Sequence, residues 1–264
     1  MKPAPFDYVA PRSLDEALSR LGDDSKALAG GQSLVPLLNF RLARPDVVVD
    51  LNRVPGLAYL RRSGGALHIG ALTRQATLER SGLVQRHWPL LCQAVSQAGH
   101  AQTRSRGTVG GSAAHADPTA ELPVALTALD ARFHLRSARG ERTLGAGDFF
   151  VSTLTSAVES DELLVEIEVP PLPDGARSAF VEYAPTHGDF AVAGAAVVNT
   201  PGACAIALLG VGDRPVRARP AEEALAAGAP LDEAAAIAAQ DVDDPWRRAL
   251  TTTLVSEAIA RTAA

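Results

Sequence analysis

The sequence predicts an α+β protein, and three of its segments carry this prediction. Residues 26–51 follow the order strand, helix and strand, which is typical of a small parallel β-α-β unit. Residues 131–144 alternate in polarity, turn at Gly140 and return, which indicates antiparallel pairing. Two β-prone runs between residues 192 and 211 precede a helical C-terminal segment. We therefore expect three units, over residues 1–54, 55–160 and 161–264.

Composition limits the class of protein. The chain has 264 residues, of which 47% are hydrophobic, so it can build two or three modest domains. Its net charge is −5 and it has no dense basic run, which argues against nucleic acid or an anionic membrane as a partner. No apolar run approaches the ~20 residues of a membrane span, and the N-terminus lacks a signal core, so we expect a cytoplasmic protein.

The cysteines and histidines do not indicate a metal site. Cys92 and Cys204 could pair, but a cytosolic chain of this size does not need that bond. Two cysteines cannot supply the four ligands of an ordinary iron–sulfur cluster, and the six histidines are scattered. We expect no metal ligands in this chain.

The first unit contains a glycine loop between its strand and its helix. Ser13 to Glu16 matches a capping box for a helix that ends at Gly22. The strand of residues 26–29 runs into Ala29-Gly30-Gly31-Gln32-Ser33-Leu34, and Ser33 is expected to cap a helix through about Ala43. A buried strand follows at 46–51. Backbone donors and the helix dipole both favour phosphate at such a strand-to-helix turn.

The second unit contains a second glycine loop. A turn at 54–57 opens it, and a hairpin about Gly64-Gly65 and helices at 72–83 and 90–98 follow. The segment Gly107 to Ser112 is then read as a loop, with Asp117 as the N-cap and Pro118 as the first residue of the next helix.

The third unit begins with a cleanly alternating strand. Val165, Ile167 and Val169 are expected on one face, opposite Glu166 and Glu168. After the strands at 192–198 and 203–211, the helices are expected to break at residues 228–230 and 244–245.

Two glycine loops of this kind suit a diphosphate held by backbone amides. A single Gly-Gly-polar triplet is more often only a tight turn, and the sequence has neither the dinucleotide fingerprint after its first strand nor a P-loop. Ser33 and Ser112 lie outside any Gly-x-Ser-x-Gly motif, so we interpret them as caps and phosphate donors. His115 and Asp117 are interpreted as a loop residue and a helix cap, and Glu121 either accepts from a ribose or favours the helix N-terminus.

Together these segments resemble a known family, the FAD-binding medium subunits of molybdenum-containing hydroxylases such as carbon monoxide dehydrogenase and xanthine dehydrogenase. The resemblance is most specific from Thr108 through Pro118 to Glu121, and it also covers residues 6–8, 45–51, 161–164 and 188–191. It implies a PCMH/VAO-type fold, in which a small β-α-β domain and an antiparallel-sheet domain clamp FAD and a C-terminal strand-and-helix domain covers the flavin.

The resemblance also implies the cofactor contacts. Residues 28–35 and 108–112 would hold the diphosphate, Glu121 the ribose or ribityl side, and Leu164 and Phe190 the ring system. The full set is Leu28, Ala29, Gly30, Gly31, Gln32, Ser33, Leu34, Val35, Ala101, Thr108, Val109, Gly110, Gly111, Ser112, Glu121, Leu164, Glu182 and Phe190. Where relatives often carry Lys or Arg before Gly188, this chain has Glu182, Pro185 and Thr186.

The implied function is electron transfer. The chain would bind FAD non-covalently, take electrons from [2Fe–2S] clusters on a partner and pass them to an external acceptor, with no catalytic side chain of its own. The implied partners are a large subunit with the molybdenum cofactor and a small iron–sulfur subunit, assembled as a dimer of heterotrimers. Two alternatives stay open: a nucleotide-binding regulatory or scaffold protein without redox turnover, and a stand-alone flavin oxidase.

Overall fold

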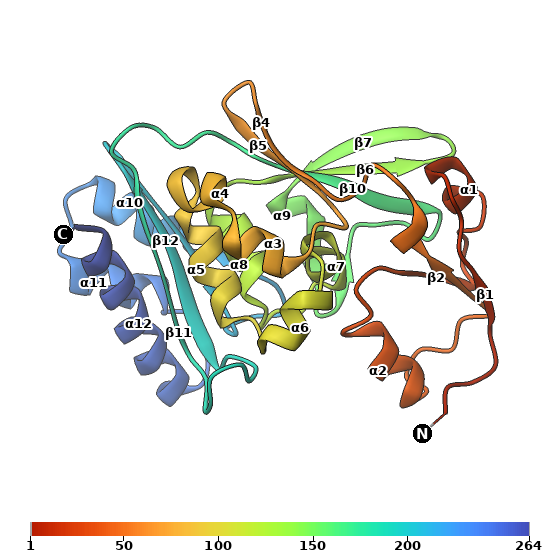
Figure 1. Cartoon of the computed structure of the whole chain (residues 1–264). Helices are drawn as coiled ribbons and strands as arrows, with labels where there is room; N and C mark the ends of the chain where they lie inside the picture. Colours follow the sequence, from red (N-terminus) through yellow and green to blue (C-terminus); the bar gives the residue numbers. More distant parts are fainter. Residues whose placement is uncertain (1, 264) are drawn as a thin grey trace.

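The computed structural model describes residues 2–263 and contains three main β-sheets with a layer of helices between the two larger ones (Figure 1). The structure combines helices with separate sheets, in agreement with the α+β class predicted from the sequence. In the part of the chain that is described, no helix combines the length and apolar character needed to cross a membrane. Cys92 and Cys204 are both free thiols, so the possible disulfide is not formed.

The N-terminal sheet is parallel, as predicted. Its strand order is β1-β3-β2, and the strand bounds are β1 (Asp7–Val9), β2 (Ser25–Leu28) and β3 (Val47–Asp50). Its helices are α1 (Leu14–Leu18), α2 (Leu34–Asn39) and the 3-10 turn η1 (Leu51–Arg53). The Ser13 side chain caps α1 by accepting from the Glu16 amide, which confirms the predicted start.

Helix α2 differs from its prediction at both ends. Ser33 makes no capping hydrogen bond, and the helix ends at Asn39 instead of continuing to Ala43. The early end has a local cause. Arg41 adopts a left-handed conformation with φ of 59°, and the amides that follow it turn back to the Leu37 carbonyl.

The middle sheet has five antiparallel strands in the order β4-β5-β10-β6-β7. Their bounds are β4 (Leu60–Ser63), β5 (Ala66–Gly70), β6 (Arg132–Ser137), β7 (Gly140–Gly145) and β10 (Glu162–Val169). The hairpin predicted at Gly64-Gly65 is present, and both glycines have positive φ. Because β10 is the central strand of this sheet, we propose that the second unit ends after Val169 and not at residue 160.

The predicted alternation of β10 is interrupted. A bulge between Leu164 and Glu166 shifts the register against β6. Ile167 and Val169 therefore face the main core, whereas Val165 packs with Leu163 toward the N-terminal unit. The placement of Val165 on the same face as Ile167 was thus wrong.

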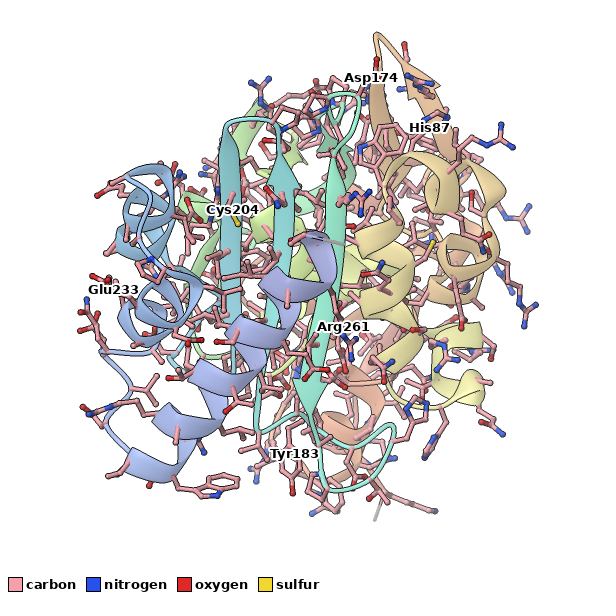
Figure 2. The ribbon with its side chains drawn as sticks, turned by 90° about the vertical axis from the view of Figure 1, so that its left-hand side faces the viewer. His87, Asp174, Tyr183, Cys204, Glu233 and Arg261 are labelled. Atoms are coloured by element: carbon pink, nitrogen blue, oxygen red, sulfur yellow. The ribbon has the colours of Figure 1, made fainter. Side chains whose placement is uncertain are left out.

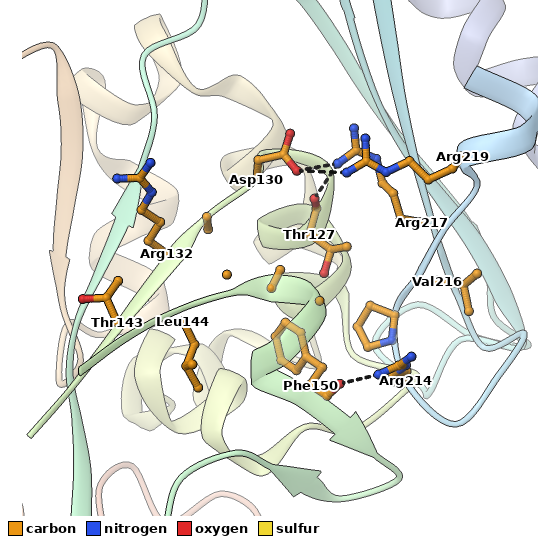
Figure 3. Close-up of a pocket in the computed structure, with 15 residues that line it drawn as sticks. Thr127, Asp130, Arg132, Thr143, Leu144, Phe150, Arg214, Val216, Arg217 and Arg219 are labelled. Atoms are coloured by element: carbon orange, nitrogen blue, oxygen red, sulfur yellow. Dashed lines mark hydrogen bonds and ion pairs between the residues drawn. The ribbon is translucent and has the colours of Figure 1, made fainter. Parts of the chain in front are cut away.

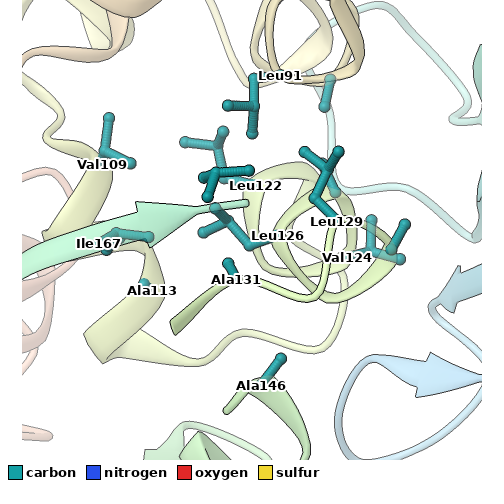
Figure 4. Close-up of a cluster of buried hydrophobic side chains, with 14 of the residues drawn as sticks. Leu91, Val109, Ala113, Leu122, Val124, Leu126, Leu129, Ala131, Ala146 and Ile167 are labelled. Carbon is teal, nitrogen blue, oxygen red and sulfur yellow. The ribbon is translucent and has the colours of Figure 1, made fainter. Parts of the chain in front are cut away.

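The helical layer fills the space between the sheets (Figure 1). Its members, with a small hairpin, are α3 (Gln75–Arg80), α4 (Gly82–His87), α5 (Pro89–Gln97), α6 (Ala101–Arg106), α7 (Val109–His115), α8 (Glu121–Ala128), α9 (Ala146–Phe149), β8 (Phe150–Ser152) and β9 (Thr155–Ser156). Buried side chains of this layer, including Leu91, Leu122 and Leu126, pack against Ile167 of the middle sheet (Figure 4). They form the largest core cluster among the described residues.

The second glycine segment is a helix and not a loop. Thr108 is the N-cap of α7, and its hydroxyl accepts from the Gly111 amide. Asp117 does not cap the next helix, since its carboxylate accepts from the Thr119 amide and hydroxyl, and α8 begins at Glu121. The predicted cap at Asp117 and helix start at Pro118 were wrong because these residues form a separate turn after α7.

The C-terminal unit pairs a four-stranded antiparallel sheet with three helices on its outer face (Figures 1 and 2). Its elements are β11 (Arg177–Tyr183), β12 (Ala193–Thr200), β13 (Ala203–Leu209), β14 (Val216–Arg217), α10 (Arg219–Ala226), α11 (Leu231–Ala238) and α12 (Pro245–Ala263). The predicted breaks between these helices are confirmed. The sheet is buried on both faces, because Val181 packs under α12 whereas Phe180 joins the main core.

Candidate cofactor site

The first glycine loop presents a row of unused backbone donors. Within residues 2–263, the backbone amides of Gly31, Gln32, Ser33 and Leu34 donate no hydrogen bond. The amide of the next residue, Val35, donates to the Gly31 carbonyl. Gly31 has φ of 75°, a conformation that glycine adopts at little cost. Consecutive amides in such a turn form a concave site for an anion.

This loop lines a cavity of about 390 Å³, shared with Asp50, Asn52 and Arg106. The Asn52 side chain holds the loop by donating to the Ala29 carbonyl at 2.8 Å, and it accepts from Arg74 Nη2 at 2.6 Å. Burial lowers the pKa of Arg74, and the charge of Arg106 lowers it further. Arg106 lines the cavity together with Gly31 and Gln32, and a guanidinium beside unused amides suits the cavity to phosphate.

The second glycine segment forms the wall behind the first loop. A β-carbon placed on Gly30 would lie 2.4 Å from the Arg106 carbonyl oxygen and 2.8 Å from Gly107 Cα. Glycine is therefore required at position 30 because two stretches of backbone meet there.

The amides of this second segment are already used within the chain. The Val109 amide donates to the Thr73 carbonyl and the Gly110 amide to the Ala71 carbonyl, both at 2.9 Å. The Ser112 amide donates to the Thr108 carbonyl at 3.1 Å, which closes the first turn of α7. Gly110 is buried, so the half-buried Gly111 and Ser112 are what this segment presents outward.

Two of the remaining predicted residues carry carboxyl groups. Glu121 is in the first turn of α8 and is 8% exposed, and burial raises its pKa to about 8. Glu182 is on β11, where burial raises its pKa to about 7. Phe190, in the loop after β11, is 75% exposed, whereas Leu164 lies inside the main core.

Helix α6, which the sequence analysis did not predict, borders the cavity at one end and the loop after β11 at the other. Arg106 at its C-terminal end lines the phosphate-suited cavity. At its N-terminal end His100 lies against the loop after β11, since a β-carbon on Gly188 would be 2.7 Å from His100 Cε1. Ala101, one of the predicted residues, is the first residue of this helix.

Sequence reasoning missed Asp50, Asn52 and Arg74. A signal was present for two of them, because Asp50 ends the buried parallel strand β3 and Asn52 lies two residues beyond it, and ligands often bind at the carboxyl ends of such strands. Arg74 reaches the loop only through the tertiary fold.

A larger cavity lies elsewhere and contains none of the predicted residues. It measures about 870 Å³ and is lined by Arg132, Arg214, Arg217 and Arg219, which come from β6, β14 and the segments beside it (Figure 3). Arg217 is engaged by Glu222 and by Asp130 at 2.6 Å, and Arg214 donates to the Phe150 carbonyl. No cluster of three His, Cys, Asp or Glu side chains with the arrangement of a metal site occurs within residues 2–263.

Comparison with known proteins decides the family. Residues 4–172 match the family described as "FAD binding domain in molybdopterin dehydrogenase". The chain belongs to this family. It is an FAD-binding subunit of the molybdenum hydroxylases and part of an oxidoreductase, as the resemblance in its sequence implied.

Related sequences align with this flavoprotein subunit over most of its length. It is 48% identical over 234 residues to the 6-hydroxypseudooxynicotine dehydrogenase complex subunit alpha of Paenarthrobacter nicotinovorans, covering 85% of this chain and 79% of the relative. It is 40% identical over 225 residues to the carbon monoxide dehydrogenase medium chain of Hydrogenophaga pseudoflava, covering 82% and 78%.

Solved structures show the same fold. A carbon monoxide dehydrogenase structure from Hydrogenophaga pseudoflava superposes with a TM-score of 0.93 at 36% identity, covering 100% of this chain and 99% of that one. Quinoline 2-oxidoreductase from Pseudomonas putida 86 gives 0.91 at 34% identity, covering 100% and 98%.

Proposed function

We propose that this chain is the electron-transfer subunit of a molybdenum hydroxylase complex, and that it passes electrons from [2Fe–2S] clusters of a partner through FAD to an external acceptor. The observation that carries the proposal is the row of four unused amides, residues 31–34, of which Gly31 and Gln32 line the cavity together with Arg106. These donors match the acceptor oxygens of a diphosphate.

The residues present fit FAD as an extended ligand. The amides of 31–34 would hold the diphosphate, with the second glycine segment as the wall that sets their position. Helix α6 would lie alongside the cofactor, with Ala101 at the end nearer to the flavin. Glu121 would bind the ribityl side, and Glu182, Leu164 and Phe190 would surround the ring end. The isoalloxazine supplies the redox chemistry when bound, and the chain binds and orients it.

We also propose a large partner that carries the molybdenum cofactor and a small iron–sulfur partner, assembled as a dimer of heterotrimers. Support comes from the relatives, which are named as subunits or medium chains of dehydrogenases. Further support comes from exposed apolar side chains on and after α2, where Phe40 is 63% and Leu42 is 76% exposed. Apolar patches of this kind are typical of surfaces that a partner covers.

Purification from the native host tests the proposal. The complex should contain FAD in this chain and molybdenum and iron in its partners. The flavin should be reduced by the complex's organic substrate only when all three subunits are present. A chain that purifies without partners and oxidises an organic substrate unaided would support a stand-alone oxidase instead. A colourless chain that binds no added FAD would support the regulatory or scaffold alternative.

A further inference from the structure

The side chain of Arg74 joins the two glycine segments through both ends of its guanidinium group. Nitrogen Nη2 donates to Asn52 Oδ1 at 2.6 Å, and Nη1 donates to the carbonyl of Arg106, the residue before the second glycine segment. Asn52 in turn donates to the Ala29 carbonyl at 2.8 Å, at the start of the first glycine loop. One side chain therefore bridges two stretches of backbone that meet at Gly30.

Backbone hydrogen bonds on either side of Arg74 fix it against the second glycine segment. The amide of Gln75 donates to the Gly107 carbonyl at 2.9 Å. The carbonyl of Thr73 accepts from the Val109 amide, also at 2.9 Å. The backbone at Arg74 is thus held in place relative to this segment, and only its side chain extends to the contacts with the first loop.

Two acceptors depend on Arg74. Within residues 2–263, no other donor bonds the Arg106 carbonyl or Asn52 Oδ1. The amides three and four residues after Arg106 belong to Val109 and Gly110, and both donate to other carbonyls. Because Arg74 donates to the amide oxygen of Asn52, the amide nitrogen of Asn52 is left to donate to the first loop.

Arg74 affects the cavity indirectly. Asn52 and Arg106 are among the residues that line the cavity, whereas Arg74 contacts both of them without being part of the lining. An influence of Arg74 on a ligand in the cavity therefore acts through Asn52 and the two glycine segments. A site whose donors are held in place before binding loses less free energy in ordering them when the ligand arrives.

We propose that Arg74 is a positioning residue for the diphosphate of FAD. By bridging Asn52 and the Arg106 carbonyl, it holds the two glycine segments in one arrangement before the cofactor binds. This inference rests on the proposed function, because it requires the diphosphate in this cavity. Without the bridge, the first loop is less constrained relative to the second segment, so FAD affinity falls although every residue that lines the cavity is unchanged.

The first test measures the dissociation constant of FAD with the apo chain by flavin fluorescence. A hydrogen bond from a charged donor is strong enough that Arg74→Met should weaken FAD binding by about tenfold or more. Arg74→Lys keeps the charge but lacks the fork that reaches two acceptors, so it should restore little of the affinity. The matched control is Arg80→Met, an exposed change at the end of α3, which should bind FAD like wild type.

A double-mutant cycle tests whether Arg74 acts through Asn52. Asn52 is exposed, so Asn52→Ala spares the core and removes the donor to the Ala29 carbonyl. If the two residues form one link, the variant with both changes should bind FAD within about threefold of Arg74→Met, whereas independent effects would multiply. Urea unfolding of the apo variants checks that each is folded, and if Arg74→Met is not, the loss of affinity in Asn52→Ala carries the test.

Three results would overturn the inference while FAD binding by the wild-type chain stands. They are wild-type affinity in folded Arg74→Met or in Asn52→Ala, full recovery in Arg74→Lys, and losses that multiply in the double variant. Absence of FAD binding by the wild-type chain would instead refute the proposed function, and the inference with it.

Discussion

Replacing Gly30 with alanine is the sharpest test of how the two glycine segments build the phosphate-suited cavity. The new β-carbon would lie 2.4 Å from the Arg106 carbonyl oxygen, 3.0 Å from the Arg106 carbonyl carbon and 2.8 Å from Gly107 Cα. All three contacts are with backbone, so no side chain can rotate away. The two segments must separate by roughly 1 Å to restore ordinary van der Waals distances.

The size of the effect follows from this overlap. Overpacking of this kind costs about 1–3 kcal/mol. If the loops keep their places, the free energy of unfolding of the apo chain falls by that amount. If the first loop instead moves away from the second glycine segment, its amides are displaced from the position that suits a diphosphate. The same free-energy cost then appears as an FAD affinity weaker by roughly 5- to 150-fold.

Flavin fluorescence titration and urea unfolding of the apo chain separate these two outcomes. Gly22→Ala is the matched control, because a β-carbon there meets nothing within 4 Å and the residue has an ordinary φ. It should change neither measurement appreciably. The reasoning fails if Gly30→Ala behaves like Gly22→Ala in both assays.

Three further predictions concern stability. Burial raises the pKa of Glu121 from 4.5 to about 8, so the stability due to its protonated form is complete below about pH 4.5 and is lost as the pH rises through 8. In urea unfolding of the apo chain, the free energy of unfolding of Glu121→Gln should therefore rise relative to that of wild type by about 1.4 kcal/mol per pH unit across that window. A difference between the two proteins that stays constant with pH would contradict this. Gly110→Ala should destabilise the fold itself by about 1–3 kcal/mol in thermal unfolding, because its β-carbon would lie 2.5 Å from Ala71 Cβ; a change confined to FAD affinity would refute this. Arg217→Met should cost about 3 kcal/mol in urea unfolding because it leaves the Glu222 carboxylate without its main partner, and adding Glu222→Gln should recover part of the loss.

Local signals predicted much of the fold. The helix breaks at residues 228–230 and before Pro245, and the turn at Gly64-Gly65, follow from the conformations that glycine and proline allow. The helix that contains Gly110 and Gly111 could not be found this way. Glycine is a poor helix former, and only the close contact of Gly110 with Ala71 explains it there.

The candidate site was predictable where its residues are contiguous. The first loop, residues 29–34, shows its chemistry in sequence, and the structure adds the observation that four of its amides are unused. Asn52 and Arg74 hold that loop through contacts between residues 22 and 23 positions apart, which no local pattern encodes. The buried side-chain oxygen of Glu182 that has no hydrogen-bond partner within residues 2–263 likewise becomes visible only in the folded structure.

The core shared between the helical layer and the C-terminal sheet has a consequence for biosynthesis. The family match ends at residue 172, but Leu122 and Leu126 belong to the same buried cluster as Phe180 and Leu209. While the ribosome has released only the first 172 residues, α5 and α8 lack the strands that cover them. That nascent intermediate exposes apolar surface until β13 has emerged, and exposed surface of this kind makes a folding intermediate prone to aggregation. The segment recognised as an evolutionary unit is therefore smaller than the unit that completes folding.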